Sequence, residues 1–308
     1  MIGVGALGKH HARLLAELPD VELVAIVDVD EQRAREIALS INAPWKTNPA
    51  EVEALVDAVT VAVPTQFHSA VALPFLRRGI PVLVEKPLAR DVAEARHMTE
   101  AAQISGAVFG VGHVERHNPA VAVVRQFIHD PKFIEVHRLG AFPNRSLDID
   151  VVFDLMIHDL DVLLSIVPSE VIAIEAAGVA VLTPQPDIAN ARLRFASGCI
   201  ANITASRISR DRVRKLRIFQ RDSYLSIDYA AQEVERWFLV KANGGAPTIE
   251  GGKLAVFQEE PLKRELADFV RAVREKGAPM VTGDDGIRAL ELAQRINDAM
   301  TVSLSDQS

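Results

Sequence analysis

The sequence predicts an α/β fold with a doubly wound parallel sheet first and a second α/β part built on an open, largely antiparallel sheet. In the first 113 residues, short apolar runs rich in β-branched residues alternate with helical patterns, which is typical of a parallel sheet covered on both faces. Beyond residue 132, strand patterns follow one another with turn signals between them. We therefore expect a boundary near residue 115, with domains at 1–115 and 116–308.

Composition and charge narrow the class of protein. The chain has 308 residues, a length typical of two domains, and its formal net charge is −7 without a long basic block. We therefore expect no nucleic-acid partner. No apolar run reaches membrane-spanning length, and Cys199 is the single cysteine, which excludes an internal disulfide. These features predict a cytoplasmic protein without a membrane partner.

The first motif is the glycine-rich loop GVGALG at residues 3–8. A helical pattern follows it, and then the apolar run VELVAIVD, which ends in Asp28, 20 residues after Gly8. This arrangement is the fingerprint of a Rossmann dinucleotide-binding domain, in which the loop admits a pyrophosphate and the carboxylate binds the adenosine ribose. The predicted cofactor contacts in this region are Gly3, Gly5, Ala6, Leu7, Gly8 and Asp28. A carboxylate at position 28 favours NAD, with NADP as the alternative.

The glycine loop of such a domain follows a buried central strand. Only Met1 and Ile2 precede the loop in this sequence. We therefore expect the native chain to begin several residues upstream of Met1.

The rest of the first part continues the alternation of strands and helices. The predicted elements are a strand at 58–64, a helix at 67–79, a strand at 80–85, a helix at 91–106 and a strand at 107–113. In parallel sheets of this kind the ligand lies beyond the carboxyl ends of the strands. The residues at those ends that we predict as cofactor contacts are Pro64, Thr65, His68, Glu85 and Lys86. For Glu85 the alternatives are that it holds Lys86 or caps the strand.

The second part begins with a helical segment at 119–130 and a strand at 132–142. The apolar helix predicted at 148–167 carries a polar stripe, because Asp154, His158, Asp161 and Ser165 recur at helical spacing. The stripe indicates either a ligand site or a solvated face, since burying it unpaired is costly. Asp154 is placed to orient the His158 imidazole. Several strands and C-terminal helices at 260–304 complete this part, and we expect those helices to pack back on the body.

Polar residues also gather at the predicted domain junction. Arg116 and Asn118 are predicted substrate or nicotinamide contacts, with salt bridges as the alternative, and Arg145 is a further candidate for substrate binding. The histidines in this region lack ligand spacing with local carboxylates, so we expect no metal.

Four motifs in this order resemble a known family: residues 3–8, Pro64-Thr65-x-x-His68, Glu85-Lys86-Pro87 and Asp154-x-x-x-His158. The chain is similar to the glucose-fructose oxidoreductase, inositol dehydrogenase and rhizopine catabolism (Gfo/Idh/MocA) family of NAD(P)-dependent sugar dehydrogenases. The resemblance implies that Lys86 and His158 are the catalytic pair and that Asp154 supports them. It also implies a homodimer or homotetramer formed through the open sheet.

Three further segments, 112–121, 145–161 and 214–234, are similar to the branch of UDP-N-acetylglucosamine 3-dehydrogenases. That resemblance implies oxidation of the sugar 3-hydroxyl to a ketone, followed by a partner aminotransferase on a route to lipid A. In the mechanism we expect, His158 takes the hydroxyl proton and Lys86 stabilises the alkoxide. The alternatives are a dehydrogenase of a free sugar or inositol, and a non-catalytic NAD(P)-binding regulator.

Overall fold

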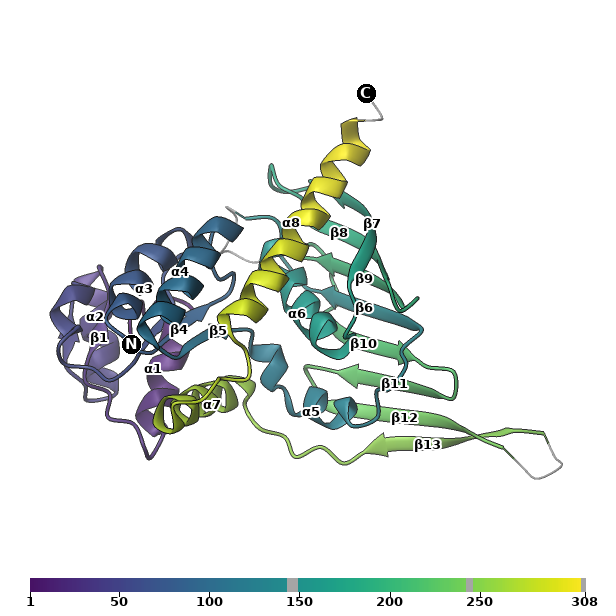
Figure 1. Cartoon of the computed structure of the whole chain (residues 1–308), viewed down its shortest axis with the longest axis horizontal. Coiled ribbons are helices and arrows are strands. Elements are labelled where there is room, and N and C mark those ends of the chain that lie inside the picture. The colour runs from purple at the N-terminus through teal and green to yellow at the C-terminus, as the bar shows by residue number, and fades with distance from the viewer. Residues whose placement is uncertain (143–148, 242–245, 306–308) are drawn as a thin grey trace. The chain divides into compact units, whose positions relative to one another are not determined.

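The structure is a computed structural model, and it describes residues 1–142, 149–241 and 246–305. By internal contact the chain divides into two compact units (Figure 1). The first contains Met1–Val114 and Glu260–Leu290, and the second contains Glu115–Glu259 and Glu291–Ser308. The predicted limits of the domains at residues 115 and 116 stay a prediction. The segment Glu260–Leu290, which we expected in the second domain, groups with the first unit.

The first unit is built on parallel strands, as the sequence predicts. One set runs in the order β3-β4-β5 and the other pairs β1 with β2, all in parallel. Ile2 forms parallel bridges to both Val27 and Val61, so the residues before the glycine loop lie between the two sets. The strands are β1 (Ile26–Val27), β2 (Trp45–Lys46), β3 (Val59–Val61), β4 (Val82–Glu85) and β5 (Phe109–Gly112).

Every residue of β3, β4 and β5 is buried, which is expected of parallel strands with helices on both faces. The helices of this unit are α1 (Gly8–Glu17), α2 (Glu31–Ser40), α3 (His68–Arg77), α4 (Val92–Ser105) and α7 (Pro261–Glu275), and α8 (Gly283–Ser305) begins in it. Asp30 and Asp91 cap α2 and α4 with their side chains, and Gly106 ends α4 in the left-handed conformation. Short 3₁₀ turns occur at Pro49–Val52 and Thr65–Phe67.

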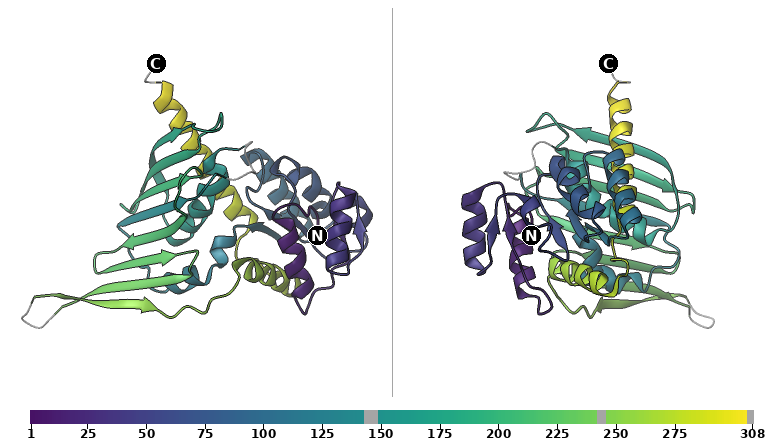
Figure 2. Two further views of the ribbon diagram at one scale, coloured as in Figure 1. Left: turned by 180° about the vertical axis from the view of Figure 1, so that it is seen from behind. Right: turned by 60° about the vertical axis from the view of Figure 1, so that its left-hand side comes forward.

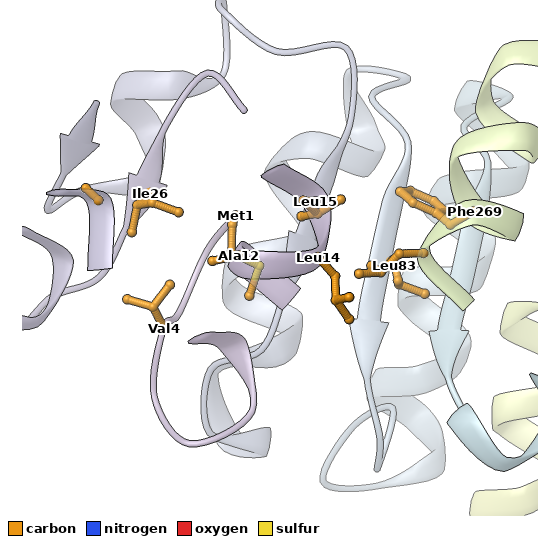
Figure 3. Close-up of a cluster of buried hydrophobic side chains, with 10 residues drawn as sticks. Met1, Val4, Ala12, Leu14, Leu15, Ile26, Leu83 and Phe269 are labelled. Carbon is orange, nitrogen blue, oxygen red and sulfur yellow. The ribbon is translucent and has the colours of Figure 1, made fainter. Parts of the chain in front are cut away.

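A hydrophobic cluster fixes α1 and α7 against this sheet (Figure 3). Leu14 and Leu15 of α1 pack with Leu83 of β4 and Phe269 of α7, and all four are almost fully buried. Deleting a buried leucine side chain costs about 2–5 kcal/mol, so this cluster is a principal reason why α7 belongs to the first unit. The packing of this cluster also fixes α1, the helix that follows the glycine loop.

The second unit is built on one eight-stranded sheet in the order β13-β12-β11-β10-β6-β9-β8-β7. Neighbouring strands are antiparallel except β6 and β9, which are parallel, so the predicted largely antiparallel sheet is confirmed. The strands are β6 (Phe133–Leu139), β7 (Val171–Val179), β8 (Ile188–Phe195), β9 (Ile200–Ser206), β10 (Val213–Phe219), β11 (Ser223–Asp228), β12 (Glu233–Val240) and β13 (Thr248–Leu254).

Helices lie on one face of this sheet (Figure 2). They are α5 (Pro119–Arg125), α6 (Ile157–Ile166) and the part of α8 from Glu291 onward, with a 3₁₀ turn at Val114–His117. Side chains in β8 alternate accordingly: Ala189, Ala191 and Leu193 are buried, whereas Asn190 and Arg194 point to the other face and are exposed. A π-helical turn, Val152–Met156, leads into α6.

Candidate active site

The glycine loop and the start of α1 have the geometry of an anion site. A Cβ atom on Gly8 would lie 1.8 Å from the carbonyl oxygen of Gly3, so only glycine fits there. A Cβ atom on Gly5 would meet nothing within 4 Å, which leaves room for a ligand against the backbone. Leu7 precedes α1 without a side-chain cap, and the first turn holds no acidic residue. The N–H groups of that turn are therefore suited to a phosphate.

Asp28 ties the end of β1 to this loop. Its Oδ2 accepts the N–H of Val4 at 2.9 Å, and its Oδ1 accepts the N–H of Asp30 at 3.0 Å. A carboxylate oxygen can accept a second hydrogen bond, so Oδ2 retains capacity for a ribose hydroxyl, whereas Oδ1 is shared between Asp30 and Arg33. Arg33 lies beside Asp28, with Nη1 3.5 Å from Oδ1, but its Nη2 is held at 2.9 Å by the Asp30 carboxylate. The loop and the carboxylate together fit NAD.

His68 connects the two loops that follow β3 and β4. The ring is fully buried, with Nδ1 3.0 Å from the carbonyl oxygen of Pro87 and Nε2 2.9 Å from that of Val63. Burial lowers the pKa of the imidazole. Both ring nitrogens face backbone carbonyls, so His68 supports this edge, and its predicted contact with the cofactor stays a prediction. Pro64 and Thr65, on the loop that His68 holds, are exposed and half-buried respectively.

The end of β4 carries Glu85 and Lys86, joined to Pro87 by a cis peptide bond. Glu85 is 7% exposed; its Oε1 lies 2.8 Å from His11 Nε2, and its Oε2 accepts the N–H of Lys86 at 3.1 Å. Burial alone would raise the pKa of Glu85, but His11 and Lys86 outweigh it and lower that pKa. Glu85 is therefore an ionised carboxylate directly behind Lys86, which is half-buried.

His11 is a residue of this site that the sequence interpretation missed. It belongs to α1 and shares the buried face of Leu14 and Leu15, at i+3 and i+4. That periodicity could have predicted a buried histidine, and a buried imidazole requires a polar partner. Glu265 of α7 lies close by: one ligand atom from each of His11, Glu85 and Glu265 falls within 4.8 Å of the others, a spacing that could hold a metal ion.

In the second unit, the polar stripe predicted from Asp154 to Ser165 begins in the π-helical turn. Asp154 lies within Val152–Met156 and is buried, and His158 follows in the first turn of α6 and is half-buried. Asp150 starts the helix, because its Oδ1 accepts the N–H groups of Val152 at 2.8 Å and Phe153 at 3.2 Å. π-Helical turns occur often at functional sites, which agrees with the role predicted for this segment.

Asp161, lower on the same stripe, is engaged with Arg116. The guanidinium Nε lies 2.8 Å from Oδ2 and Nη2 lies 2.5 Å from Oδ1, and both residues are buried. Asn118 donates to the Glu115 carboxylate and to the carbonyl of Tyr229, each at 3.1 Å. The structure therefore shows the salt-bridge alternative for Arg116 and a backbone contact for Asn118. Their substrate contacts stay predictions, and Arg145 lies outside the described residues.

Arg138 is the centre of the same buried network. Its Nε lies 2.6 Å from Asp159 Oδ2, and its Nη1 lies 3.0 Å from Glu115 Oε1. Burial alone would lower the pKa of the guanidinium, but the two carboxylates outweigh it and raise that pKa. The cation also lies over the ring of Tyr229, 5.4 Å from its centroid. The Arg138 guanidinium and the carboxylates of Asp159 and Glu115 are therefore paired inside the second unit.

Comparison with known proteins assigns the chain to a family. Residues 1–113 match the model of an oxidoreductase family with an NAD-binding Rossmann fold, and residues 122–225 match the GFO/IDH/MocA C-terminal domain. The chain belongs to the Gfo/Idh/MocA oxidoreductase family. It is therefore an NAD-binding oxidoreductase, and its first unit contains the cofactor domain. None of the helices in residues 1–142, 149–241 and 246–305 is both long and apolar enough to span a membrane.

Two relatives resemble the chain over nearly its whole length. A UDP-N-acetylglucosamine 3-dehydrogenase of Acidithiobacillus ferrooxidans is 34% identical over 308 residues, covering 99% of this chain and 97% of that protein. A solved structure of the A. ferrooxidans enzyme has a TM-score of 0.90 at 33% identity, covering 97% of this chain and 95% of that one. A scyllo-inositol 2-dehydrogenase (NAD(+)) of Bacillus subtilis is 26% identical over 311 residues, covering 95% of this chain and 90% of that protein.

Proposed function

We propose that the protein is an NAD-dependent dehydrogenase that oxidises the 3-hydroxyl of UDP-N-acetylglucosamine to a ketone. The observation that carries the dehydrogenase chemistry is Lys86 at the carboxyl end of β4, on the sheet that also bears the glycine loop and Asp28. The substrate rests on the 34% identity to the A. ferrooxidans enzyme over almost all of both chains. Fold alone would not distinguish one sugar from another.

In the proposed mechanism two side chains act on one substrate hydroxyl. The glycine loop and Asp28 would hold NAD, which would supply the acceptor for the hydride of C3. His158 takes the hydroxyl proton at its imidazole, since the unperturbed pKa of histidine, near neutrality, suits a general base. The Lys86 ammonium donates to the same oxygen and stabilises the negative charge that develops there. Asp154, four residues before His158, orients the imidazole.

We also propose that the cofactor is NAD in preference to NADP. The Asp28 carboxylate would accept a hydrogen bond from a ribose 2′-hydroxyl and would repel a 2′-phosphate. Arg33, the cation next to it, is held by Asp30. We expect cofactor titrations followed by NADH and NADPH fluorescence to show tighter binding of NADH, and the reverse order would refute this preference.

The function is tested by the absorbance of reduced cofactor with three substrates: UDP-N-acetylglucosamine, free N-acetylglucosamine and myo-inositol. We expect reduction of NAD that depends on the nucleotide sugar and is lost in His158→Ala. His10→Ala is the matched control, because His10 is exposed and should not affect turnover. Reduction with a free polyol alone would keep the mechanism and discard the substrate. Tight NADH binding without turnover of any substrate would favour a non-catalytic regulator.

A second candidate is a dehydrogenase of inositol or of a free sugar. The similarity to the B. subtilis scyllo-inositol 2-dehydrogenase favours it, although at lower identity. The same substrate panel separates the two candidates.

We further propose a cytoplasmic homodimer or homotetramer that pairs through the helix-free face of the eight-stranded sheet and works with an aminotransferase in lipid A synthesis. Phe133, Phe219 and Tyr224 form a row across that face, with ring centroids 5.7 and 5.0 Å apart. Phe219 is 37% exposed and Trp237 39%, an apolar surface that a second copy would cover. Light scattering should show an oligomer that Phe219→Glu dissociates, whereas a monomeric wild-type protein would refute the assembly.

A further inference from the structure

A buried polar cluster lies behind Lys86 in the first unit. It consists of His11 from α1, Glu85 from β4 and Glu265 from α7, with exposed fractions of 1%, 7% and 1%. The proposed proton transfer at His158 and Lys86 does not use His11 or Glu265. Buried charged groups of this kind are costly unless they are paired, so the arrangement requires an explanation.

The Glu85 carboxylate is fixed from several sides. His11 Nε2 lies 2.8 Å from Oε1, and the N–H of Lys86 donates to Oε2 at 3.1 Å. The side chain also packs over Gly112 of β5, where an added Cβ atom would come within 3.0 Å of the Glu85 Cδ. These contacts restrict the orientation of the carboxylate, and its hydrogen bond to Lys86 restricts that peptide N–H in turn.

We propose that His11 is a positioning residue for Lys86 and acts through Glu85. His11 follows Gly8 by three residues, so one helix carries both the proposed phosphate site at its start and the imidazole that holds Glu85. Without His11, the ionised carboxylate would be buried with one fewer partner, and it would turn or take up a proton. Either change weakens its bond to the Lys86 N–H and alters where the amine lies. This inference rests on the role proposed for Lys86.

The first test compares His11→Leu with His11→Gln. Leucine removes the hydrogen bond to Glu85, whereas the glutamine amide can still donate to it. We expect His11→Leu to lower kcat about 10- to 100-fold with the NADH dissociation constant within about twofold, and His11→Gln to recover most of the loss. His10→Leu is the matched control on the same helix. Equal kcat in His11→Leu and wild type would overturn the proposal.

A double-mutant cycle separates positioning from general damage to the fold. If His11 acts only through Lys86, His11→Leu should cause no further loss of kcat in a Lys86→Ala background. Equal losses in both backgrounds would overturn the role of His11 and leave the role of Lys86 intact. Near-native turnover in Lys86→Ala alone would refute the proposed function, and the inference with it.

Two further measurements test the proposal, and the first does not depend on the identity of the sugar. The rate at which acetic anhydride labels Lys86, followed by peptide mass spectrometry, should change several-fold in His11→Leu and remain unchanged in His10→Leu. An unchanged rate in His11→Leu would contradict the proposal. Turnover should also survive dialysis against EDTA. A loss that added zinc restores would make the three side chains metal ligands and overturn the positioning role.

Discussion

The two units use charged residues in opposite ways. In the first unit, Asp28 and Glu85 accept backbone N–H groups at strand ends, and Asp28 keeps the capacity for further bonds. In the second unit, Arg116 and Arg138 are buried and make paired contacts with Asp161 and Asp159. The comparison teaches that a charged motif near a presumed site indicates a ligand contact only when its hydrogen-bonding groups are not already used inside the fold.

Asp187 shows the second arrangement most fully. Its side chain is 0% exposed; Oδ2 accepts the N–H groups of Val181, Leu182 and Thr183, and Oδ1 lies 2.9 Å from Arg207 Nε. Arg207 also donates to the carbonyl of Ile149 at 2.8 Å. This network therefore connects β8 and β9 to the segment that enters the π-helical turn, and we infer a role in stability.

The largest expected effect separates the proposed catalytic residues from the structural ones. Lys86→Ala and His158→Ala should each lower kcat about 10²- to 10⁴-fold, the usual range for proton transfer and charge stabilisation. NADH binding and the thermal midpoint should change little, because we expect the glycine loop and Asp28 to hold most of the cofactor and because neither variant removes a core side chain. Steady-state kinetics with fluorescence titration measures both quantities. Near-native kcat in either variant would refute the catalytic role proposed for that residue.

A large loss of stability is expected from Asp187→Asn. Breaking a buried ion pair costs about 3–5 kcal/mol, since it leaves the Arg207 cation without its carboxylate. Urea denaturation should show this loss in the free energy of unfolding. A variant as stable as the wild type would show that the pair is not a structural element.

The pH dependence of stability should report the same carboxylate. Burial alone would raise the pKa of Asp187, but the three N–H groups and Arg207 hold it well below its usual range. A lowered folded-state pKa stabilises the fold above the unfolded value, about 3.9, and this contribution is lost as pH falls further. The free energy of unfolding, measured by urea titration, should therefore fall less steeply from pH 6 to pH 2 for Asp187→Asn than for wild type. An equally steep fall in both proteins would contradict the lowered pKa assigned to Asp187.

A substitution of Arg116, at the predicted domain junction, tests whether this cation is a structural partner of Asp161 or a substrate contact. Arg116→Met should lower the free energy of unfolding by about 3 kcal/mol, because Asp161 remains buried without its partner. The KM for the substrate should change less than about threefold at temperatures where the variant is folded. A KM raised more than tenfold in an equally stable protein would restore the predicted substrate contact.

The smallest effect concerns the cofactor. Asp30→Ser keeps a side-chain cap on α2 but removes the carboxylate that holds Arg33. Exposed ion pairs contribute about 1 kcal/mol or less, so we expect NADPH binding to tighten only a few-fold and NADH binding to stay the same. Arg35→Ala, on the exposed side of the same helix, is the control. An unchanged NADPH affinity would show that Asp30 has no part in cofactor choice.

The sequence predicted the elements that depend on local pattern. The parallel sheet, the glycine loop and the carboxylate at Asp28 follow from apolar periodicity and from a spacing with a direct physical meaning. The partners of His11 and His68 could not be predicted, because they come from residues distant in the chain. The contact between His11 and Glu85, for example, spans 74 positions. The sequence could not decide between a substrate contact and a salt bridge for Arg116 for the same reason, since its neighbours in the chain do not reveal that Asp161 lies against it.

The most direct test of the proposed function locates the new ketone. The protein would be incubated with NAD and UDP-N-acetylglucosamine, the product reduced with sodium borodeuteride, and the deuterium located in the sugar by NMR. We expect deuterium at C3 with wild-type protein and none with His158→Ala. Deuterium at another carbon, or labelling of myo-inositol but not of the nucleotide sugar, would contradict the proposed reaction.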